Sequence, residues 1–298
     1  MMDLKEYLQN KTVQIDRSLL ALLPPSSAYP EIIHESVSYS IFAGGKRLRP
    51  ILCLAGAEAL GGDSSELLPV ACALEMIHTY SLVHDDLPAM DDDDYRRGKP
   101  TNHKVFGEGI AVLAGDALLT LAFEVLAAYG MRVKEEKRSQ VLAVIQEIAR
   151  AAGAFGMIGG QAVDLQSEGK KIESATLEYI HRHKTGALFT AAVRAGALLS
   201  QATEHQLAAL SRYAENFGLA FQITDDLLDI EGSAEVIGKP VGSDIRNEKV
   251  TYPSLYGLEN TKRLAAETIE KAVEALSDLP GDAEPLRLLV QYLLKRDR

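Results

Sequence analysis

The chain contains no tryptophan, only two cysteines and few aromatic residues, which make up 6% of its 298 positions. Cys53 and Cys72 lie in Leu- and Ala-rich sequence, which predicts buried core thiols in a reducing, cytoplasmic compartment. Basic residues are also scarce, since 31 Lys and Arg against 42 Asp and Glu give a net charge of −11. Nucleic-acid binding needs basic surfaces that neutralise phosphates, so this balance argues against a nucleic-acid partner.

Signals for export and membrane insertion are missing as well. The first ten residues carry Asp3 and Glu6 and lack the basic-then-apolar order of a signal peptide. The longest apolar stretch, residues 109–130, holds Asp116 and Glu124. A central Asp costs roughly 2.5 to 3.5 kcal/mol on membrane insertion. We therefore expect a buried helix there and no insertion of the chain into a membrane.

The residue pattern favours an all-α fold. Strict alternation of apolar and polar residues is rare, whereas Ala, Leu and Glu recur at helical spacing, and 47% hydrophobic content excludes a disordered chain. No composition break divides residues 1–298, which predicts a single domain. Pro24 and Pro25 close a first amphipathic helix, and Gly44-Gly45 ends a second segment. Further helices are predicted at about residues 50–60, 66–87, 108–129, 135–166, 174–181, 184–200, 204–230, 251–277 and 283–295. The chain thus reads as a helical bundle whose sites lie between facing helices.

Two aspartate clusters, residues 85–94 and 225–229, lie 140 positions apart and have the same surroundings. Each ends a largely apolar stretch and runs into a loop that holds Gly-Lys-Pro. The glycine of that loop, Gly98 or Gly238, falls thirteen positions after the first Asp of its cluster. Carboxylates and cations therefore recur in one order, which indicates a site for a metal-bridged polyanion. The structural alternative for residues 91–94 alone is a solvated acidic loop.

Helical register decides which side chains of these clusters converge. Asp225 and Asp229 form an i, i+4 pair of like charges, which is unfavourable unless a cation lies between them. In the first cluster Pro88 disfavours helix at Leu87, so we expect a bend that brings Asp91 towards Asp85. Oxygen ligands of this kind suit a hard divalent cation, typically Mg²⁺ when phosphates complete its coordination.

Basic residues follow both clusters. Arginine offers planar, bidentate contacts to phosphate, and lysine offers a mobile point charge. The basic islands are Lys46, Arg47 and Arg49; Arg96, Arg97 and Lys99; and Lys239 and Lys249. Lys184-Thr185-Gly186 is predicted to begin a helix, where it is either an anion site or an ordinary cap. His78 shares a helix face with Ser81 and Asp85, and it is either a ligand or a satisfied core histidine.

Over nearly its whole length the chain resembles the trans-prenyltransferases that make short-chain isoprenyl diphosphates, in particular the bacterial farnesyl diphosphate synthase group. Either aspartate cluster alone would be weak support, because terpene cyclases carry one too, but the combination is specific. The matching segments are residues 44–50 (GGKRLRP), 84–101 (HDDLPAMDDDDYRRGKPT), 159–164 (GGQAVD), 184–185 and 221–229, then 238–240 (GKP) with Asp244, Lys249 and 251–253.

The resemblance implies an isoprenoid-synthase helical bundle, usually a homodimer, with a deep central cavity between the aspartate helices. Three Mg²⁺ ions would be bound by Asp85, Asp91 and Asp225, with Asp86 and Asp229 as further ligands or as groups behind them. The residues that would contact the allylic diphosphate held by these ions are Arg96, Lys184, Thr185, Gln222 and Lys239. Those that would hold isopentenyl diphosphate are Lys46, Arg49, His78 and Arg97. Lys184 and Lys239 count with the aspartates as catalytic.

The implied reaction joins isopentenyl diphosphate head to tail to dimethylallyl and geranyl diphosphate and releases pyrophosphate. In the family, the residue five before the first aspartate helps to floor the cavity, and here it is Tyr80, next to Ser81. It lies roughly 7.5 Å below Asp85 along a helix. An aromatic side chain there favours farnesyl diphosphate, unless Tyr80 only packs against a neighbouring helix.

Three alternatives accompany this interpretation. A geranylgeranyl diphosphate synthase shares every motif and differs in product length. An HD-type phosphohydrolase is suggested by His84-Asp85 in a helical protein, but it leaves the second cluster and Lys239 unused. An inactive helical partner subunit predicts lost aspartates, whereas both clusters are intact.

Overall fold

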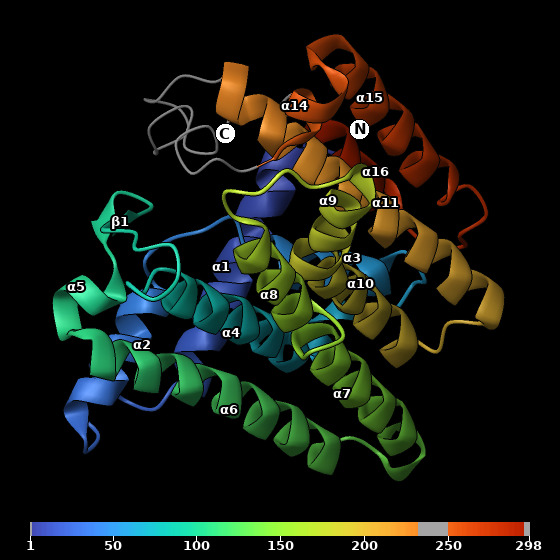
Figure 1. Cartoon of the computed structure of the whole chain (residues 1–298). Coiled ribbons are helices and arrows are strands. Elements are labelled where there is room, and N and C mark those ends of the chain that lie inside the picture. Colours follow the sequence, from blue (N-terminus) through green and yellow to red (C-terminus); the bar gives the residue numbers. More distant parts are fainter. Residues whose placement is uncertain (1, 232–249, 295–298) are drawn as a thin grey trace.

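The computed structural model describes residues 2–231 and 250–294, and this part of the chain is almost entirely helical (Figure 1). The all-α prediction is confirmed. The longer helices are α1 (Leu4–Leu22), α2 (Glu31–Ile41), α3 (Leu48–Glu58), α4 (Leu68–Asp85), α6 (Glu108–Arg132), α7 (Arg138–Ala152), α8 (Met157–Ser167), α10 (Ala187–Leu199), α11 (Glu204–Glu231), α15 (Leu258–Glu274) and α16 (Glu284–Tyr292). Shorter elements are η1 (Ser64–Leu67), β1 (Tyr95–Arg96), β2 (Lys99–Pro100), α5 (Asn102–Phe106), η2 (Glu135–Lys137), α9 (Ser174–Ile180), η3 (His181–Gly186) and α14 (Tyr252–Tyr256).

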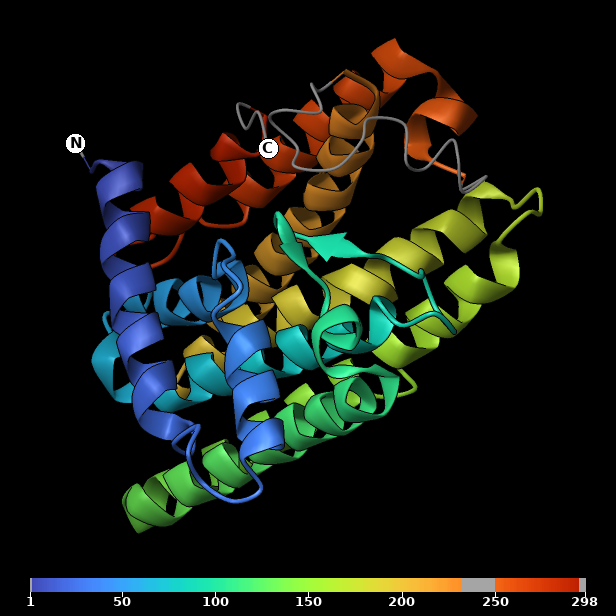
Figure 2. The same cartoon turned by 90° about the vertical axis from the view of Figure 1, so that its left-hand side faces the viewer.

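The helices pack around one apolar cluster that reaches from Ile15 in α1 to Leu293 after α16. Within it α4 packs against α6, α3 against α10, and α11 against α15. The two views of Figures 1 and 2 show α4 running through the middle of the bundle. Both cysteines are buried and free, as the sequence predicted, and burial raises the pKa of each thiol to about 12.

Two of the predicted helices are divided in the structure. The segment predicted as 135–166 breaks between α7 and α8, where Gly153 and Gly156 leave the helical conformation. The segment predicted as 251–277 breaks at Gly257, whose φ of +76° favours glycine over residues with a side chain. Both errors concern glycines inside an otherwise helical pattern, which composition alone does not distinguish from tolerated helix glycines.

The prediction that Lys184 begins a new helix is wrong. The chain stays helical from α9 through η3 into α10, and η3 is a π-helical segment. No glycine or proline interrupts residues 180–185, so nothing in the sequence stops the helix there. Lys184 therefore acts from inside a helix, and the backbone N–H groups of a helix N-terminus are not available beside it.

The long apolar helix α6 was predicted to be buried, but only one side of it faces the core. Ala114, Leu118 and Ala122 face the core, whereas Val112 and Leu113 on the other side are 41% and 53% exposed. By length and composition alone, three helical stretches of the described chain could cross a membrane: Ser64–Asp85, Glu108–Arg132 and Glu135–Ser167. The absence of membrane insertion stays a prediction.

Candidate active site

The first aspartate cluster begins where α4 ends. The helix stops at Asp85, and the chain then turns back so that the Asp91 N–H donates to the Asp85 carbonyl over 2.9 Å. A second bond of 3.1 Å runs from the Asp92 N–H to the Leu87 carbonyl. Because Leu87 precedes Pro88, it cannot easily stay helical, and this places the end of the helix. The expected bend is present as a complete helix end, which brings residue 91 back beside residue 85.

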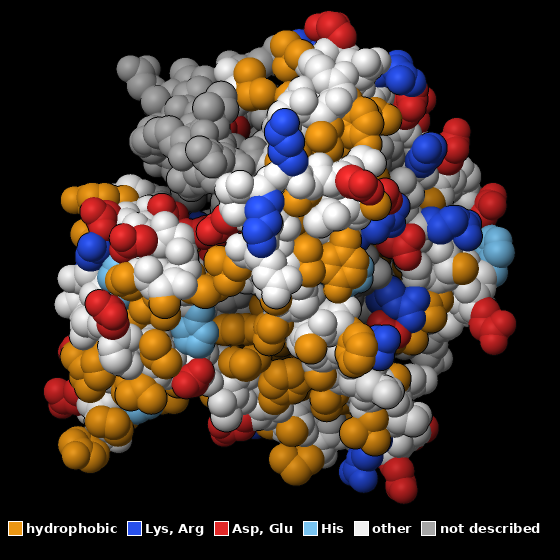
Figure 3. Space-filling model, viewed as in Figure 1, with side chains coloured by type: hydrophobic (Ala, Val, Ile, Leu, Met, Phe, Trp, Pro, Cys, Tyr) orange, Lys and Arg blue, Asp and Glu red, His pale blue; other side chains and the backbone are white. Residues whose placement is uncertain are grey.

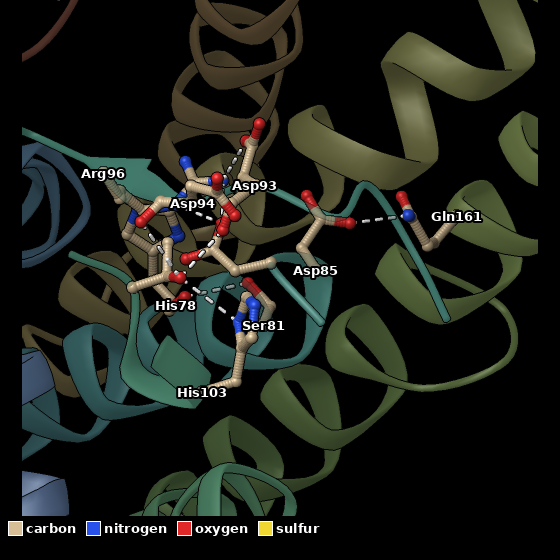
Figure 4. A network of polar contacts seen from close by, with 10 residues as sticks. His78, Ser81, Asp85, Asp93, Asp94, Arg96, His103 and Gln161 are labelled. Atoms are coloured by element: carbon tan, nitrogen blue, oxygen red, sulfur yellow. Dashed lines mark hydrogen bonds and ion pairs between the residues drawn. The ribbon is translucent and has the colours of Figure 1, made fainter. Parts of the chain in front are cut away.

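Helix α8 supplies a partner for Asp85 that the sequence analysis did not assign. The Gln161 side-chain amide donates to Asp85 Oδ1 over 2.6 Å, and Figure 4 shows Asp85 turned away from Asp93 and Asp94 towards it. The other amide atom, Gln161 Oε1, is buried without a hydrogen-bond partner among the described residues. Gln161 thus fixes the orientation of one carboxylate of the predicted metal site.

Lys184 is held by Asp164 of α8, another residue without a predicted role. Lys184 Nζ donates to Asp164 Oδ2 over 2.7 Å. Burial alone would lower the pKa of Lys184, but the charges of Asp85, Asp164 and Asp91 raise it above its usual value. This electrostatic influence places Lys184 near both aspartates of the first cluster. Gln161 and Asp164 are spaced i, i+3 in the segment 159–164, and that spacing was the available signal for both.

Residues of η3 and α11 line a cavity of about 280 Å³. Four of the predicted site residues meet there, since Lys184 and Thr185 face Gln222 and Asp225 across it. The full lining is Asp164, Ser167, Glu168, Ile172, Leu177, Ile180, His181, Lys184, Thr185, Gln222, Asp225, Asp226, Val250 and Thr251. Asp229 lies one turn beyond Asp225 on α11 and is half-buried. Lys239 falls outside the described residues.

Asp226 and His181 form a buried group at the edge of this cavity. Asp226 Oδ2 accepts a hydrogen bond of 2.8 Å from the Tyr252 N–H, which attaches the start of α14 to α11. The His181 ring stacks on Tyr252, with centroids 5.4 Å apart. Burial lowers the pKa of His181 to about 4, although Asp164 acts in the opposite direction. His181 is therefore a neutral imidazole at neutral pH.

A second, basic cluster lies around His78 of α4. Burial lowers the pKa of His78, Arg49 and Arg97, and neighbouring arginines lower each pKa further: Arg49 and Arg97 act on His78, and Arg97 acts on Arg49. For Arg49 the lowered pKa is about 10, although Glu75 raises it. The Arg49 guanidinium lies 4.4 Å from the Phe189 ring centroid, and its buried Nε has no hydrogen-bond partner among the described residues. Buried cations crowded together in this way are typical of a site that binds an anion.

Backbone geometry at Gly44 and Gly45 shapes this cluster. Both glycines have positive φ, and the Arg97 guanidinium lies directly against them, donating to the Gly44 carbonyl. A Cβ on Gly45 would come within 2.5 Å of Arg97 Nη1. Lys46, the next residue, is exposed. The predicted isopentenyl diphosphate residues Lys46, Arg49, His78 and Arg97 thus come from two loops and two helices that the fold brings together.

Two basic residues are already engaged in ion pairs. Arg47 is buried, donating 2.8 Å to Glu75 and 2.9 Å to Asp16, so it is a structural residue. Arg96 donates to the buried Asp86 over 2.6 Å, and its pKa is raised by this bond despite burial. Asp86 as a metal ligand and Arg96 as a phosphate contact stay predictions, because in this structure each side chain holds the other.

Tyr80 is 5% exposed and packs edge to face against His84, with centroids 5.7 Å apart. Its hydroxyl is buried without a hydrogen-bond partner among the described residues. His84 in turn lies against Gly115 of α6, where a Cβ would come within 2.1 Å of the ring. The Ser81 hydroxyl donates to the His78 carbonyl over 2.8 Å. Tyr80 is therefore a rigid apolar block below Asp85, between α4 and α6.

The donor set fits Mg²⁺. Asp85, Asp91 and Asp225 offer hard carboxylate oxygens next to Lys184, and Mg²⁺ prefers such oxygens together with phosphate and water. Asp92, Asp94 and His103 also offer ligand atoms within 4.8 Å of one another. In that second group, however, Lys104 pairs with Asp94 over 2.6 Å and already balances its charge. The fit to a catalytic cation is therefore better at Asp85, Asp91 and Asp225.

An all-α bundle with two carboxylate clusters facing a lysine, and a separate basic cluster, defines a prenyltransferase of the isoprenoid-synthase type. The chain belongs to the polyprenyl synthetase family, whose model matches residues 30–284. This membership confirms the family resemblance and gives no support to the HD-type phosphohydrolase alternative.

Relatives and solved structures agree on the family and differ in product. The chain is 51% identical to a farnesyl diphosphate synthase of Geobacillus stearothermophilus, over 90% of each chain. It is 47% identical to a geranylgeranyl diphosphate synthase of Cyanophora paradoxa, over 99% of this chain and 97% of the relative. Its fold matches that of an FPP/GFPP synthase from Zymomonas mobilis with a TM-score of 0.86 and 37% identity, covering 98% of each chain.

Proposed function

We propose that this protein condenses isopentenyl diphosphate with dimethylallyl and then geranyl diphosphate, giving farnesyl diphosphate and pyrophosphate. The observation that carries the product length is Tyr80, whose buried ring lies about one and a half turns below Asp85 and packs against His84, which in turn lies against Gly115 of α6. A chain that grows from the aspartates towards α6 would meet this ring. The membership of the polyprenyl synthetase family supports the reaction class.

The cavity beside η3 is the proposed site of the allylic diphosphate. Lys184, oriented by Asp164, and Thr185 with Gln222 would bind its oxygens, while Asp85, Asp91 and Asp225 would hold three Mg²⁺ ions. When bound, Mg²⁺ supplies positive charge that stabilises the departing pyrophosphate. The raised pKa of Lys184 keeps its ammonium charged at physiological pH, so it stabilises the same developing negative charge.

The basic cluster is the proposed site of isopentenyl diphosphate. Arg49, Arg97 and His78 form a group of their own, and the lining of the cavity with Lys184 and Asp225 includes none of them, so the second diphosphate would be held apart from the first. In the reaction the allylic C–O bond breaks and its electron pair leaves with pyrophosphate. The C=C bond of isopentenyl diphosphate then forms the new C–C bond, and a proton is lost to the departing pyrophosphate. Exclusion of water from the site would protect the cation from capture.

Geranylgeranyl diphosphate is the second candidate product, because the similarity to the Cyanophora paradoxa enzyme is nearly as high. The test is to incubate the protein with isopentenyl diphosphate, Mg²⁺ and each allylic primer, and to identify the products by chromatography after dephosphorylation. Farnesol as the main product supports the proposal. Geranylgeraniol would replace it with the second candidate, and no condensation would contradict both.

We also infer that the protein is a cytoplasmic homodimer built from one domain per chain. Space-filling Figure 3 shows apolar side chains gathered on the face where α6, α7 and α8 lie. Exposed members on these helices include Leu113, Leu142 and Ile158, and Phe155 lies between α7 and α8. A second copy of the chain would cover this face, since patches of this kind mark protein interfaces.

A further inference from the structure

His181 is the first residue of η3, and its side chain has no assigned role. It lines the same cavity as Lys184 and Thr185, and only 9% of the side chain is exposed. Its Nε2 is buried and has no hydrogen-bond partner among the residues that the structure describes. Leaving a buried polar atom unsatisfied costs about 1 to 3 kcal/mol, so such an atom at a binding cavity calls for a ligand.

The ring of His181 is fixed on one side by its neighbours. It stacks on Tyr252 at an interplanar angle of 24°. Asp226 Oδ2 is 3.9 Å from Nε2, which is beyond hydrogen-bonding distance, and it already accepts from the Tyr252 N–H. Tyr252 and Asp226 thus hold the imidazole in place without satisfying it.

Position in the π-helical segment separates this histidine from a second one. His181 lines one cavity together with Lys184 and Thr185. Arg182, His183 and Gly186 line a different cavity of about 460 Å³ between α7, α10 and α11. The His183 ring stacks on Tyr179 there, with centroids 3.9 Å apart. One short segment therefore presents one imidazole to the site and one away from it.

We propose that His181 is a positioning residue for the allylic diphosphate, whose Nε2–H donates a hydrogen bond to an oxygen of the diphosphate bound beside Lys184. This inference rests on the proposed function, since it requires a diphosphate in this cavity. A neutral donor suits the position, because the lining already contains the lysine cation and the carboxylates of Asp164 and Asp225. It adds a directional contact to phosphate without changing the charge that the aspartates and metal ions balance.

The test compares three variants of the full-length protein. His181→Phe keeps a flat ring against Tyr252 and removes the donor, whereas His181→Gln restores a donor near the position of Nε2. His183→Phe is the matched control, with the same substitution on the opposite side of the same segment. Binding of inorganic pyrophosphate in the presence of Mg²⁺ is measured by isothermal titration calorimetry, which needs no turnover. A hydrogen bond to a charged ligand predicts a loss of about tenfold or more for His181→Phe.

The expected pattern is weakened pyrophosphate binding in His181→Phe, recovery in His181→Gln, and no change in His183→Phe. In steady-state assays His181→Phe should raise the KM for the allylic substrate and leave the KM for isopentenyl diphosphate unchanged. Pyrophosphate affinity in His181→Phe equal to that of the unmodified protein overturns the proposal, as does an equal loss in His181→Gln. If the unmodified protein binds pyrophosphate but forms no prenyl product, the proposed function is wrong. The role of His181 in diphosphate binding is then decided by the calorimetry of the three variants alone.

Discussion

At the scale of single residues, the aspartates divide into those that face the cavity and those used by the fold. Asp225 lines the cavity, whereas its neighbour Asp226 is buried and bonded to the Tyr252 N–H. Likewise Asp85 is oriented by Gln161, whereas Asp86 is buried under Arg96. We therefore expect the first aspartate of each cluster to serve the site, while the second makes contacts within the fold. Adjacent residues on a helix point about 100° apart, which separates the two roles.

We expect Asp225→Asn to lower kcat by roughly 10²- to 10³-fold, the usual effect of removing one group that stabilises charge in a transition state. Pyrophosphate release from isopentenyl and geranyl diphosphate measures this, and circular dichroism checks the fold. Asp278→Asn, at an exposed position after α15, is the control and should leave turnover unchanged. Turnover by Asp225→Asn within twofold of the unmodified protein would refute the metal assignment.

Tyr80→Ala should lengthen the product, because it removes the ring that blocks the space between α4 and α6. The expected result is a shift from farnesol towards geranylgeraniol in product chromatography. Tyr80→Phe keeps the ring and removes only a hydroxyl that has no hydrogen-bond partner among the described residues, so it should keep the farnesyl product. An unchanged distribution in Tyr80→Ala would mean that the ring only packs against its neighbours.

His181 should also make the stability of the protein depend on pH. Its pKa is about 4 in the folded protein, against 6.5 ordinarily, so the unfolded chain binds the proton more readily between these values. The free energy of unfolding should therefore fall as the pH drops from about 6.5 to about 4, by roughly 3 kcal/mol at most from this residue. Urea unfolding at pH 7 and pH 5 measures the effect. The free energy of unfolding of His181→Phe should fall less between pH 7 and pH 5 than that of the unmodified protein. An equal fall in both proteins would show that His181 is not its origin.

At the scale of helices, the positions of most elements follow from the sequence, but the junctions do not. Apolar periodicity predicted α4, α6, α10 and α11 to within a few residues. The breaks at Gly156 and Gly257 occur at glycines that composition does not distinguish from tolerated helix glycines, and residues 180–185 carry no signal for a helix end. Contacts between helices are also not visible in the local sequence. Gly160 illustrates this, because its lack of a side chain matters only where α8 meets η3.

The site shows the same division. Charge and spacing predicted Asp85 and Asp225 as ligands of a cation, whereas the roles of Lys184, Thr185 and Gln222 were implied by the resemblance to the prenyltransferases. Gln161, Asp164 and His181 were missed, because an amide, a carboxylate and a histidine inside apolar helices have no role until their partners are known. Gln161 is 76 positions from its hydrogen-bond partner Asp85, and Asp164 is 20 positions from its partner Lys184. These pairs are recognised only once the chain is folded.

Gly160→Ala should separate α8 from η3. A Cβ at this position would lie 2.2 Å from the Lys184 backbone nitrogen, so the two helices must move apart. Overpacking of this kind costs about 1 to 3 kcal/mol of stability. Because Asp164 and Gln161 are on the same helix, activity should also fall. Thermal unfolding and product formation measure both effects.

Gly109→Ala is the control for this variant, since an added Cβ in α6 meets no atom within 4 Å. It should leave activity unchanged and stability equal or slightly higher, because alanine favours a helix over glycine. If Gly160→Ala were as stable and active as Gly109→Ala, the close approach of α8 and η3 would not be what positions Lys184.

At the scale of the whole molecule, the exposed apolar face of α6 predicts the oligomeric state. Leu113→Glu should convert the dimer into a monomer, because it places a charge in the apolar face that a second copy would cover. Size-exclusion chromatography with light scattering measures the mass, expected at about twice the 32.4 kDa of one chain before the change. Leu20→Glu alters a residue of α1 that is 68% exposed, and it should stay dimeric. A monomeric unmodified protein would contradict the proposed dimer.

The π-helical segment η3 also limits how this chain can be aligned with its relatives. Its i to i+5 bonding accommodates one residue more than a regular helix of the same length. Deleting one residue between His181 and Lys184 would restore a regular helix and leave the faces of α9 and α10 nearly unchanged, because the wide turn absorbs the extra residue locally. A one-residue alignment gap in this segment is therefore compatible with the same faces of α9 and α10, whereas the same gap inside α10 would rotate everything beyond it by about 100°.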